Sequence, residues 1–384
     1  MFHPATEPFL DTIRARSSNR QVTQTDRRLD SGSSPILSFS ENDYLGLSRH
    51  PKVTEAARLS ILEHGAGARA ARLLASACPK HQKLETTLAR WKSTEKALLF
   101  SAGYLVPLGV IPALVGSQDT VVMERNAHAC LFDGARLSNA KIRSFDRLQP
   151  ESLAKVLQLT RKIHPHGKIL IVTESLHSMD GDLLPLAEIV RLKDEFSSWL
   201  LLDEAHAGGL FGPKGSGWAS ELGLSGRIEV QMGTLGKSLG TSGGFVAASD
   251  EIIRHFINEA RTFLFGTALP PASAGAAQAA LEILQSTEGD QLRAKLRDNI
   301  KTFGSLRKTL LNGPIQPVPC SSNQAALELS LHLMQNGIHV PAIRPPTVPE
   351  GTARLRISLS SSHSSEEIHR LNRALNELLP QTLP

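Results

Sequence analysis

The sequence is poor in cysteine and has no long uncharged apolar run. Its three cysteines, Cys78, Cys130 and Cys320, lie far apart in the 384 residues and form no C-x-x-C pair. This spacing argues against both a disulfide framework and a zinc site, so we expect no metal and a reducing compartment. No apolar run is long enough to cross a bilayer, and the first residues lack the basic region and apolar run of a secretory signal. We therefore expect a cytoplasmic protein with no membrane partner.

The chain also lacks a cluster of residues with charge of the same sign. Its formal net charge is +5 and its pI is about 9.2, but the basic residues are scattered along the sequence. This scatter weakens a nucleic-acid-binding interpretation, and a mildly basic protein suits small anionic substrates. Hydrophobic residues make up 41% of the chain. Such a chain can bury a sizeable core and form more than one domain.

Short apolar runs alternate with helical patterns between residues 96 and 248. Strands are predicted at residues 96–100, 119–123, 168–173, 199–203 and 245–248, and helices at 106–115, 128–137 and 186–196. Strands that are apolar throughout and alternate with helices indicate an α/β fold with a mostly parallel sheet covered on both faces. Ligands of such sheets bind at the carboxyl ends of the strands.

The two ends of the chain differ from this middle part. Residues 1–45 are polar and predict an N-terminal arm, with Gly32, Ser33, Ser34 and Pro35 as a connector. Residues 46–270 are expected to form the large domain, and residues 271–384 a smaller α+β C-terminal domain. In the latter we predict helices at 272–284 and up to about 310, a strand at 355–359 and a final helix. Ser364 and Glu367 fit a capping box at the start of that helix.

A glycine-rich loop with one lysine, at residues 230–244, is the most informative stretch. Lys237 has three possible explanations: a solvated surface lysine, the end of a phosphate-binding P-loop, or a lysine that forms a Schiff base with pyridoxal phosphate (PLP). The P-loop pattern G-x-x-x-x-G-K-[ST] requires a glycine at position 231, where the chain has Gln231. The PLP interpretation requires partners for Lys237 at other strand ends.

Such partners follow the predicted strands. Asp203 is our candidate for the carboxylate beside the pyridine nitrogen, His206 for the group that holds the phenolic oxygen, and His128 for the flat side chain that stacks on the ring. Hydroxyls and main-chain amides for the phosphate are offered by Gly103, Tyr104, Ser178 and Thr234. The sequence Asp203-Glu-Ala-His206 also occurs in helicase-type NTPases. In those proteins the phosphate loop precedes the acidic box, whereas here the lysine loop follows it.

With these motifs in place, the chain resembles the α-oxoamine synthases, which are fold-type I PLP enzymes that join an amino acid to an acyl-CoA. Residues 342–356 most closely resemble the branch that condenses L-alanine with pimeloyl-CoA or pimeloyl-carrier protein in biotin biosynthesis. Other stretches that look like family motifs are residues 42–47, 65–72, His81 with Leu84 and Glu85, 178–182 and 265–271.

The resemblance implies a role for each matching residue. Lys237 would bind PLP covalently and move protons, with Asp203 and His128 as the other catalytic residues. His206, Gly103, Tyr104, Ser178 and Thr234 would serve the cofactor, and Thr267 would reach its phosphate from the partner subunit of a homodimer. Arg356 would bind the amino acid carboxylate. The remaining substrate-binding positions are Arg20, Asn42, His128 and Thr347.

Three departures from the family pattern bear on the choice of acyl chain. Ala75, Ser76 and Ala77 stand where Ser-Gly-Asn is usual, Pro107 replaces a common asparagine, and His177 replaces an apolar residue. Another amino acid and acyl-CoA pair, such as glycine with a short acyl chain, is therefore the alternative reaction. A nucleotide-driven motor and a family member that only binds a partner are the alternatives from other classes.

Overall fold

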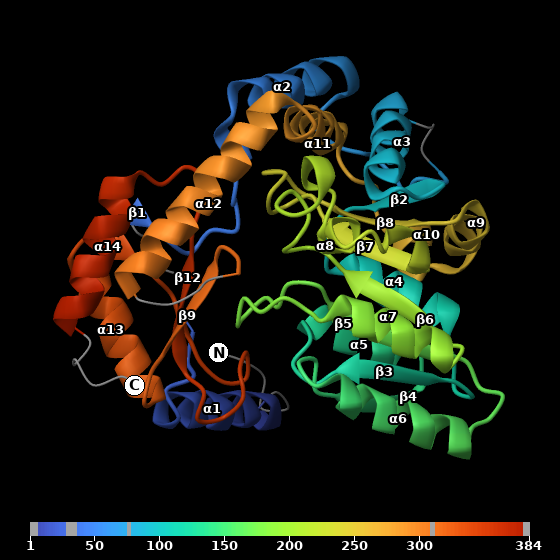
Figure 1. Cartoon of the computed structure of the whole chain (residues 1–384), viewed down its shortest axis with the longest axis horizontal. Helices are drawn as coiled ribbons and strands as arrows, with labels where there is room; N and C mark the ends of the chain where they lie inside the picture. Colours follow the sequence, from blue (N-terminus) through green and yellow to red (C-terminus); the bar gives the residue numbers. More distant parts are fainter. Residues whose placement is uncertain (1–6, 28–36, 75–77, 308–311, 379–384) are drawn as a thin grey trace. The chain divides into compact units, whose positions relative to one another are not determined.

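The computed structural model describes residues 7–27, 37–74, 78–307 and 312–378 (Figure 1). These residues form two compact units. Unit 1 takes the described parts of residues 1–41, 299–359 and 363–384, and unit 2 takes those of residues 42–298 and 360–362. The predicted domain boundaries after residues 45 and 270 stay a prediction. The predicted connector around Gly32 and Pro35, and the departure at Ala75, Ser76 and Ala77, lie outside the described residues.

Unit 2 contains a seven-stranded sheet in the order β2-β8-β7-β6-β5-β3-β4. All its strands run in the same direction except β8, which is antiparallel to both β7 and β2. The prediction of a mostly parallel sheet is therefore confirmed. The strands are β2 (Lys96–Phe100), β3 (Thr120–Glu124), β4 (Lys141–Phe145), β5 (Ile169–Glu174), β6 (Trp199–Asp203), β7 (Val230–Thr234) and β8 (Gly244–Ala248).

Both faces of this sheet are covered, because alternate residues of one strand enter different cores. Leu170 and Val172 of β5 belong to a cluster with residues of α4, α5 and α9, whereas Ile169 and Ile171 belong to one with α6 and α7. This explains why the central strands are apolar throughout. The covering helices are α4 (Leu105–Leu114), α5 (Ala129–Leu137), α6 (Pro150–Ile163), α7 (Leu186–Glu195), α9 (Asp250–Glu259) and the short α10 (Arg261–Leu264).

Unit 2 has further helices besides those named above. Helix α11 packs against α2 and α3, and α12 continues from unit 2 into unit 1. Their bounds are α2 (Pro51–His64), α3 (Pro79–Lys92), α8 (Trp218–Glu221), α11 (Pro271–Leu284) and α12 (Thr287–Arg307). Within the described ranges, none of the helices has both the length and the apolarity that crossing a membrane requires.

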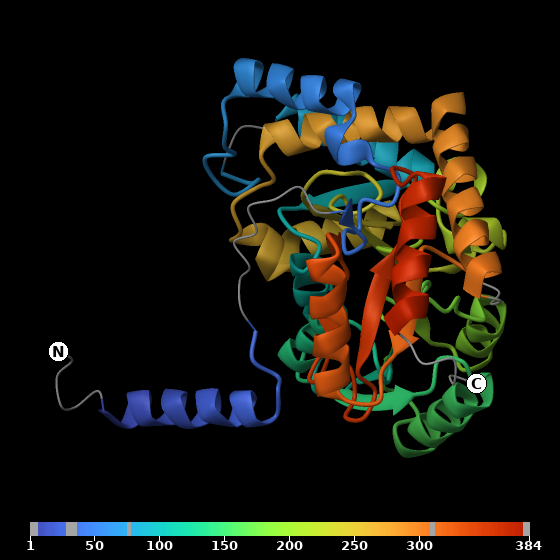
Figure 2. The same ribbon diagram turned by 90° about the vertical axis from the view of Figure 1, so that its left-hand side faces the viewer.

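Unit 1 has a three-stranded antiparallel sheet in the order β11-β12-β9 and a short parallel pair, β1 with β10. Helix α13 packs on the larger sheet and contacts α14 (Figure 2). The predicted capping box is confirmed: Ser364 N donates to Glu367 Oε2 at 2.7 Å, and Glu367 N donates to Ser364 Oγ at 3.2 Å. The elements are α1 (Glu7–Val22), β1 (Leu37–Ser38), β9 (Ile315–Pro319), α13 (Asn323–Gln335), β10 (Ile338–His339), β11 (Ala342–Ile343), β12 (Arg354–Ser358) and α14 (Ser365–Leu378).

Candidate active site

The carboxyl ends of the parallel strands of unit 2 lie along one edge of the sheet. Gly103 follows β2, His128 follows β3, Ser178 follows β5, and Asp203 ends β6. Lys237 follows β7, the neighbour of β6. Parallel strands in one sheet bring the loops after them to the same side. The topology thus gathers these predicted residues at one edge.

Lys237 begins a chain of hydrogen-bonded side chains. Its Nζ lies 2.7 Å from Nε2 of His206, and Nδ1 of the same ring lies 2.7 Å from the hydroxyl of Tyr44. Tyr44 is completely buried and donates to Asn42 Oδ1 at 3.1 Å. Both ring nitrogens of His206 therefore have partners, which fixes the orientation of the ring beside the lysine.

Asp203 presents a buried carboxylate close to this lysine. Its Oδ1 accepts a hydrogen bond from Ala205 N at 2.8 Å. Burial raises the pKa of Asp203, and the positive charge of Lys237 acts in the opposite direction. A buried carboxylate whose charge is poorly solvated is suited to a cationic ligand group, because such a partner offsets the cost of desolvation.

The neighbouring Glu204 has a structural use. Its carboxylate forms a buried ion pair with Lys92 and accepts a hydrogen bond from Ala219 N at 2.9 Å. Lys92 Nζ also donates to Ser216 O at 2.5 Å. Of the Asp-Glu-Ala-His sequence, only Asp203 and His206 are thus available to Lys237, so the resemblance to an NTPase box does not extend to the roles of its residues.

His128 lies at the N-terminus of α5 and caps it. Its Nδ1 accepts from Cys130 N at 3.3 Å, and its ring stands edge-on to Tyr104, with centroids 6.1 Å apart and planes at 75°. The Tyr104 hydroxyl donates to Asp133, which raises the pKa of Tyr104 to about 12. The predicted stacking residue is thus held by its helix and by an aromatic neighbour.

At two positions of the site, a side chain larger than that of glycine would crowd neighbouring atoms. A Cβ at Gly103 would lie 3.0 Å from Thr234 Oγ1, so this position brings the main chain close to Thr234. Gly240, three residues after Lys237, has φ of +64°, and a Cβ there would lie 2.3 Å from Ser48 N. The Thr234 hydroxyl donates to Gly243 O at 3.0 Å and accepts from Gly236 N at 3.2 Å.

These residues fit PLP. The amine of Lys237 lies beside an oriented imidazole and a buried carboxylate, and Gly103 and Gly240 bring the main chain close to neighbouring residues. Two side chains at this edge were missed by the sequence analysis, Tyr44 and Glu174. Their only sequence signal was their position, Tyr44 within a family motif and Glu174 directly before the Ser178 loop.

Four predicted residues do not follow strands of this sheet. Thr267 is exposed in unit 2, and its role toward a partner subunit stays a prediction. Arg20, Thr347 and Arg356 belong to unit 1. There Arg356 Nη1 donates to Ser358 Oγ at 2.9 Å, Arg27 Nη2 donates to Thr347 Oγ1 at 2.8 Å, and Arg20 Nε faces Asp26 Oδ1 at 3.8 Å. Their substrate-binding roles also stay predictions.

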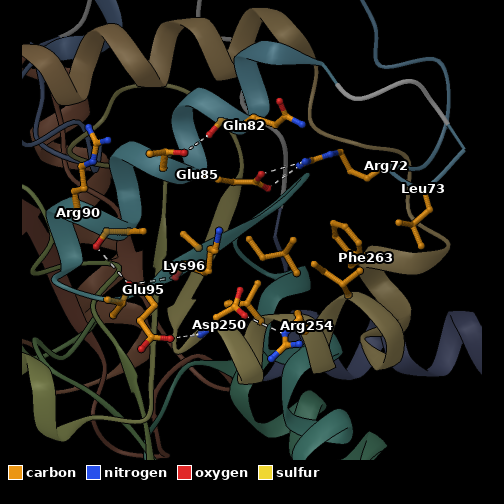
Figure 3. A pocket seen from close by; sticks show the side chains of 17 residues that line it. Arg72, Leu73, Gln82, Glu85, Arg90, Glu95, Lys96, Asp250, Arg254 and Phe263 are labelled. Atoms are coloured by element: carbon orange, nitrogen blue, oxygen red, sulfur yellow. Dashed lines mark hydrogen bonds and ion pairs between the residues drawn. The ribbon is translucent and has the colours of Figure 1, made fainter.

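A separate pocket of unit 2 opens at the amino end of β2, away from the Ser101–Tyr104 turn. It has a volume of about 580 Å³, and Arg72 and Glu85 form a two-pronged ion pair on its wall, with N–O distances of 2.7 and 3.1 Å (Figure 3). Arg254 pairs with Asp250 on the opposite side, at 3.0 Å. None of the predicted cofactor-binding residues lines this pocket, so it is not the candidate site.

Comparison with known proteins agrees with this geometry. Residues 34–375 match the family of class I and II aminotransferases. An 8-amino-7-oxononanoate synthase of Methylococcus capsulatus is 41% identical, with 99% of each chain covered, and one of Thioalkalivibrio sulfidiphilus is 43% identical, with 89% of this chain and 88% of that one covered. The chain belongs to the 8-amino-7-oxononanoate synthase family. The resemblance that the sequence analysis identified is confirmed.

Solved structures confirm the fold-type I architecture for this 8-amino-7-oxononanoate synthase family member. A serine palmitoyltransferase of S. paucimobilis with a bound PLP–myriocin aldimine superposes with a TM-score of 0.88, at 26% identity, over 98% of this chain and 99% of that chain. The 8-amino-7-oxononanoate synthase of Francisella tularensis gives a TM-score of 0.74 at 27% identity, over 89% of this chain and 97% of that chain.

Proposed function

We propose that the protein condenses L-alanine with a pimeloyl thioester, carried by CoA or by a carrier protein, and releases CO2 to give 8-amino-7-oxononanoate. PLP is the cofactor, and the reaction serves biotin biosynthesis in the cytoplasm. The observation that carries the proposal is the approach of Lys237 Nζ to His206 Nε2, at 2.7 Å, beside the buried Asp203. The identity of 41% and 43% to named synthases supports the choice of substrates.

Asp203 is assigned to the ring nitrogen of the cofactor. PLP supplies an electron sink for the α-carbon of the amino acid, and it does so best when its ring nitrogen is protonated. Because burial raises the pKa of Asp203 in the chain alone, its carboxylate gains most when a cationic group pairs with it. The carboxylate of Asp203 would thus pair with the protonated ring nitrogen.

Lys237 has two tasks. Its Nζ would hold PLP covalently, and its free amine would take a proton from the α-carbon of the amino acid and return one to the product. Gly240 allows the loop after the lysine to pass close to Ser48, so the lysine is held in a defined loop. A base held close to the reacting carbon acts by positioning as well as by basicity.

His206 is assigned to the phenolic oxygen of the cofactor. This oxygen requires a donor, so Nε2 must carry the proton and Nδ1 must accept one. The hydroxyl of Tyr44, 2.7 Å from Nδ1, can supply that proton, since a hydroxyl both donates and accepts. In the chain alone Tyr44 donates to Asn42 Oδ1, so the exchange of the two arrangements requires rotation of the hydroxyl and transfer of the ring proton from Nδ1 to Nε2.

Substrate recognition is assigned to the residues that match the family. Arg356 binds the alanine carboxylate, His128 stacks on the cofactor, and Asn42, Thr347 and Arg20 contact the substrates. Thr267, exposed in the single chain, reaches the cofactor phosphate of the partner subunit in a homodimer. Gly103, Tyr104, Ser178 and Thr234 serve the phosphate and ring. The exposure of Thr267 and the guanidinium chemistry of Arg356 support these assignments.

The main alternative is the same chemistry with another substrate pair. We would compare release of the free thiol from pimeloyl-CoA, pimeloyl-carrier protein and a short acyl-CoA, each with L-alanine and with glycine. Thiol release is expected with alanine and a pimeloyl thioester and is expected to stop in Lys237→Ala. Faster release from glycine with the short acyl-CoA would replace our substrate assignment with the alternative pair.

A further inference from the structure

Glu174, the last residue of β5, is a buried carboxylate that joins two loops of the candidate site. Its Oε1 accepts a hydrogen bond from His128 N at 2.8 Å, and its Oε2 accepts one from Ser178 N at 3.1 Å. The Ser178 hydroxyl lies 3.5 Å from Oε1. One side chain thus holds the main chain of two residues that come from different strand ends.

A metal ion is a poor alternative explanation for this carboxylate. Ligand atoms of Glu124, Glu174 and His177 lie within 4.8 Å of one another. However, His177 Nε2 lies 2.9 Å from the carbonyl oxygen of Asn126, which can only accept, so this nitrogen carries a proton and has no lone pair for a metal. Arg147, with Nε 3.7 Å from Glu124 Oε1, already supplies positive charge to the cluster.

The two acceptor oxygens explain why a glutamate is suited to this position. Two main-chain N–H groups from different loops require two acceptors, and a buried N–H without a partner is costly. A glutamine offers one oxygen and turns an NH2 group toward the second N–H. An aspartate carries the same charge, but its side chain is one methylene shorter and does not span both loops.

His128 is consequently fixed at two points. Glu174 holds its N–H, and Nδ1 of its own ring accepts from Cys130 N at 3.3 Å. We propose that Glu174 is a positioning residue of this enzyme, which sets the His128 ring and the Ser178 loop in the one arrangement that receives PLP. This inference rests on the proposed roles of His128 and Ser178 at the cofactor.

The test compares two carboxylates of the same sheet in the PLP-loaded enzyme. Glu174→Gln is the probe. Glu229→Gln is the matched control, because Glu229 Oε2 accepts from Leu200 N at 2.8 Å near the start of β6, at the opposite edge. The measurements are the PLP dissociation constant and the circular dichroism of the cofactor's visible band, which reports how rigidly the cofactor is held.

For Glu174→Gln we expect PLP affinity to fall roughly tenfold, the size of one lost charge-assisted hydrogen bond, and the visible dichroism to weaken. Glu229→Gln should change neither. Glu174→Asp should also lose affinity, because its shorter side chain keeps the charge but cannot reach both N–H groups. Affinity and dichroism within twofold of the unmodified enzyme in both Glu174 variants would overturn the inference.

A failure of the proposed function would give other results than a failure of the inference on Glu174. If the unmodified protein bound no PLP, or if its visible band persisted in Lys237→Ala, the site assignment itself would be wrong. If the unmodified protein bound PLP through Lys237 and Glu174→Gln matched Glu229→Gln, only the role of Glu174 would be wrong.

Discussion

The hydroxyl of Tyr44 lies 2.7 Å from Nδ1 of His206, whose Nε2 lies 2.7 Å from Nζ of Lys237. A tyrosine from the start of unit 2 thus contacts the far side of the imidazole that faces Lys237. The contact matters because the hydrogen bond at one ring nitrogen determines whether the other nitrogen donates or accepts. Tyr44 is therefore in a position to set the protonation of the group beside the lysine.

Tyr44→Phe tests this relation. The variant removes the hydroxyl that lies beside His206 Nδ1. Either tautomer of the imidazole then becomes more accessible, so the phenolic oxygen of PLP should be held less well. We expect turnover to fall about tenfold to a hundredfold and the pH titration of the cofactor's visible band to shift. Spectrophotometric titration of the purified enzyme measures this. An unchanged titration midpoint would show that Tyr44 does not act on His206.

Asp203→Asn and Glu204→Gln should separate catalysis from folding. Asp203→Asn keeps the size of the side chain and removes the charge assigned to the ring nitrogen, so we expect turnover to fall at least about a hundredfold with a folded chain. Glu204→Gln should mainly lower stability, because Glu204 pairs with Lys92 and holds Ala219 N. Steady-state kinetics and urea unfolding of both variants measure this. Equal loss of turnover in the two variants would contradict the division of roles.

The buried pair of Lys92 and Glu204 gives a prediction for stability. Lys92→Met leaves the carboxylate of Glu204 buried without its cation, which should cost about 3–5 kcal/mol in the free energy of unfolding. The double variant Lys92→Met with Glu204→Gln should recover part of this loss, since it removes the unpaired charge. Urea unfolding monitored by circular dichroism measures both. A loss below about 1 kcal/mol in Lys92→Met would show that the pair is solvated.

The pKa of Glu174 predicts a pH dependence of stability in the PLP-free protein. Burial, and secondarily the nearby carboxylates of Glu124 and Asp203, raise this pKa to about 7. A raised carboxyl pKa stabilises the fold at low pH, and this stabilisation is lost as the pH rises through 7. From pH 5 to 8 the loss should be on the order of 2 kcal/mol.

The Glu174→Gln variant should lack this pH-dependent contribution to stability, because a glutamine side chain has no proton to lose. The difference in unfolding free energy between the variant and the unmodified protein should therefore change in favour of the variant as the pH rises. Unfolding curves at several pH values measure it. A constant difference across this range would mean that Glu174 is charged throughout.

The sequence predicted strands that are buried over most of their length, both at the edge of the sheet, as β2, and in its middle, as β6. The residue ranges 96–100 and 199–203 match β2 and β6, because an apolar run between polar turns leaves little freedom in the boundaries. Strand β4 was missed, since at the sheet edge it is partly exposed and carries Lys141 and Arg143. Strand β9 was missed because Pro317 and Pro319 interrupt its pattern.

The candidate site was predictable where a motif carried its chemistry. Lys237, Asp203 and His206 each stand in a recognisable stretch, and the structure brings them to one edge of the sheet. Tyr44 and Glu174 were missed, because their partners His206 and His128 lie far away in sequence and only the folded chain brings them together. Hydrogen bonds of this kind leave no periodicity in a sequence.

The central claim is that the protein joins alanine to a pimeloyl group with loss of the alanine carboxyl carbon. Incubation of the PLP-loaded enzyme with carboxyl-labelled L-alanine and pimeloyl-CoA, followed by mass spectrometry, tests it directly. We predict one labelled CO2 and one free CoA for each unlabelled molecule of 8-amino-7-oxononanoate, and none of these in Lys237→Ala. Free CoA without labelled CO2, or a product that retains the label, would contradict the account.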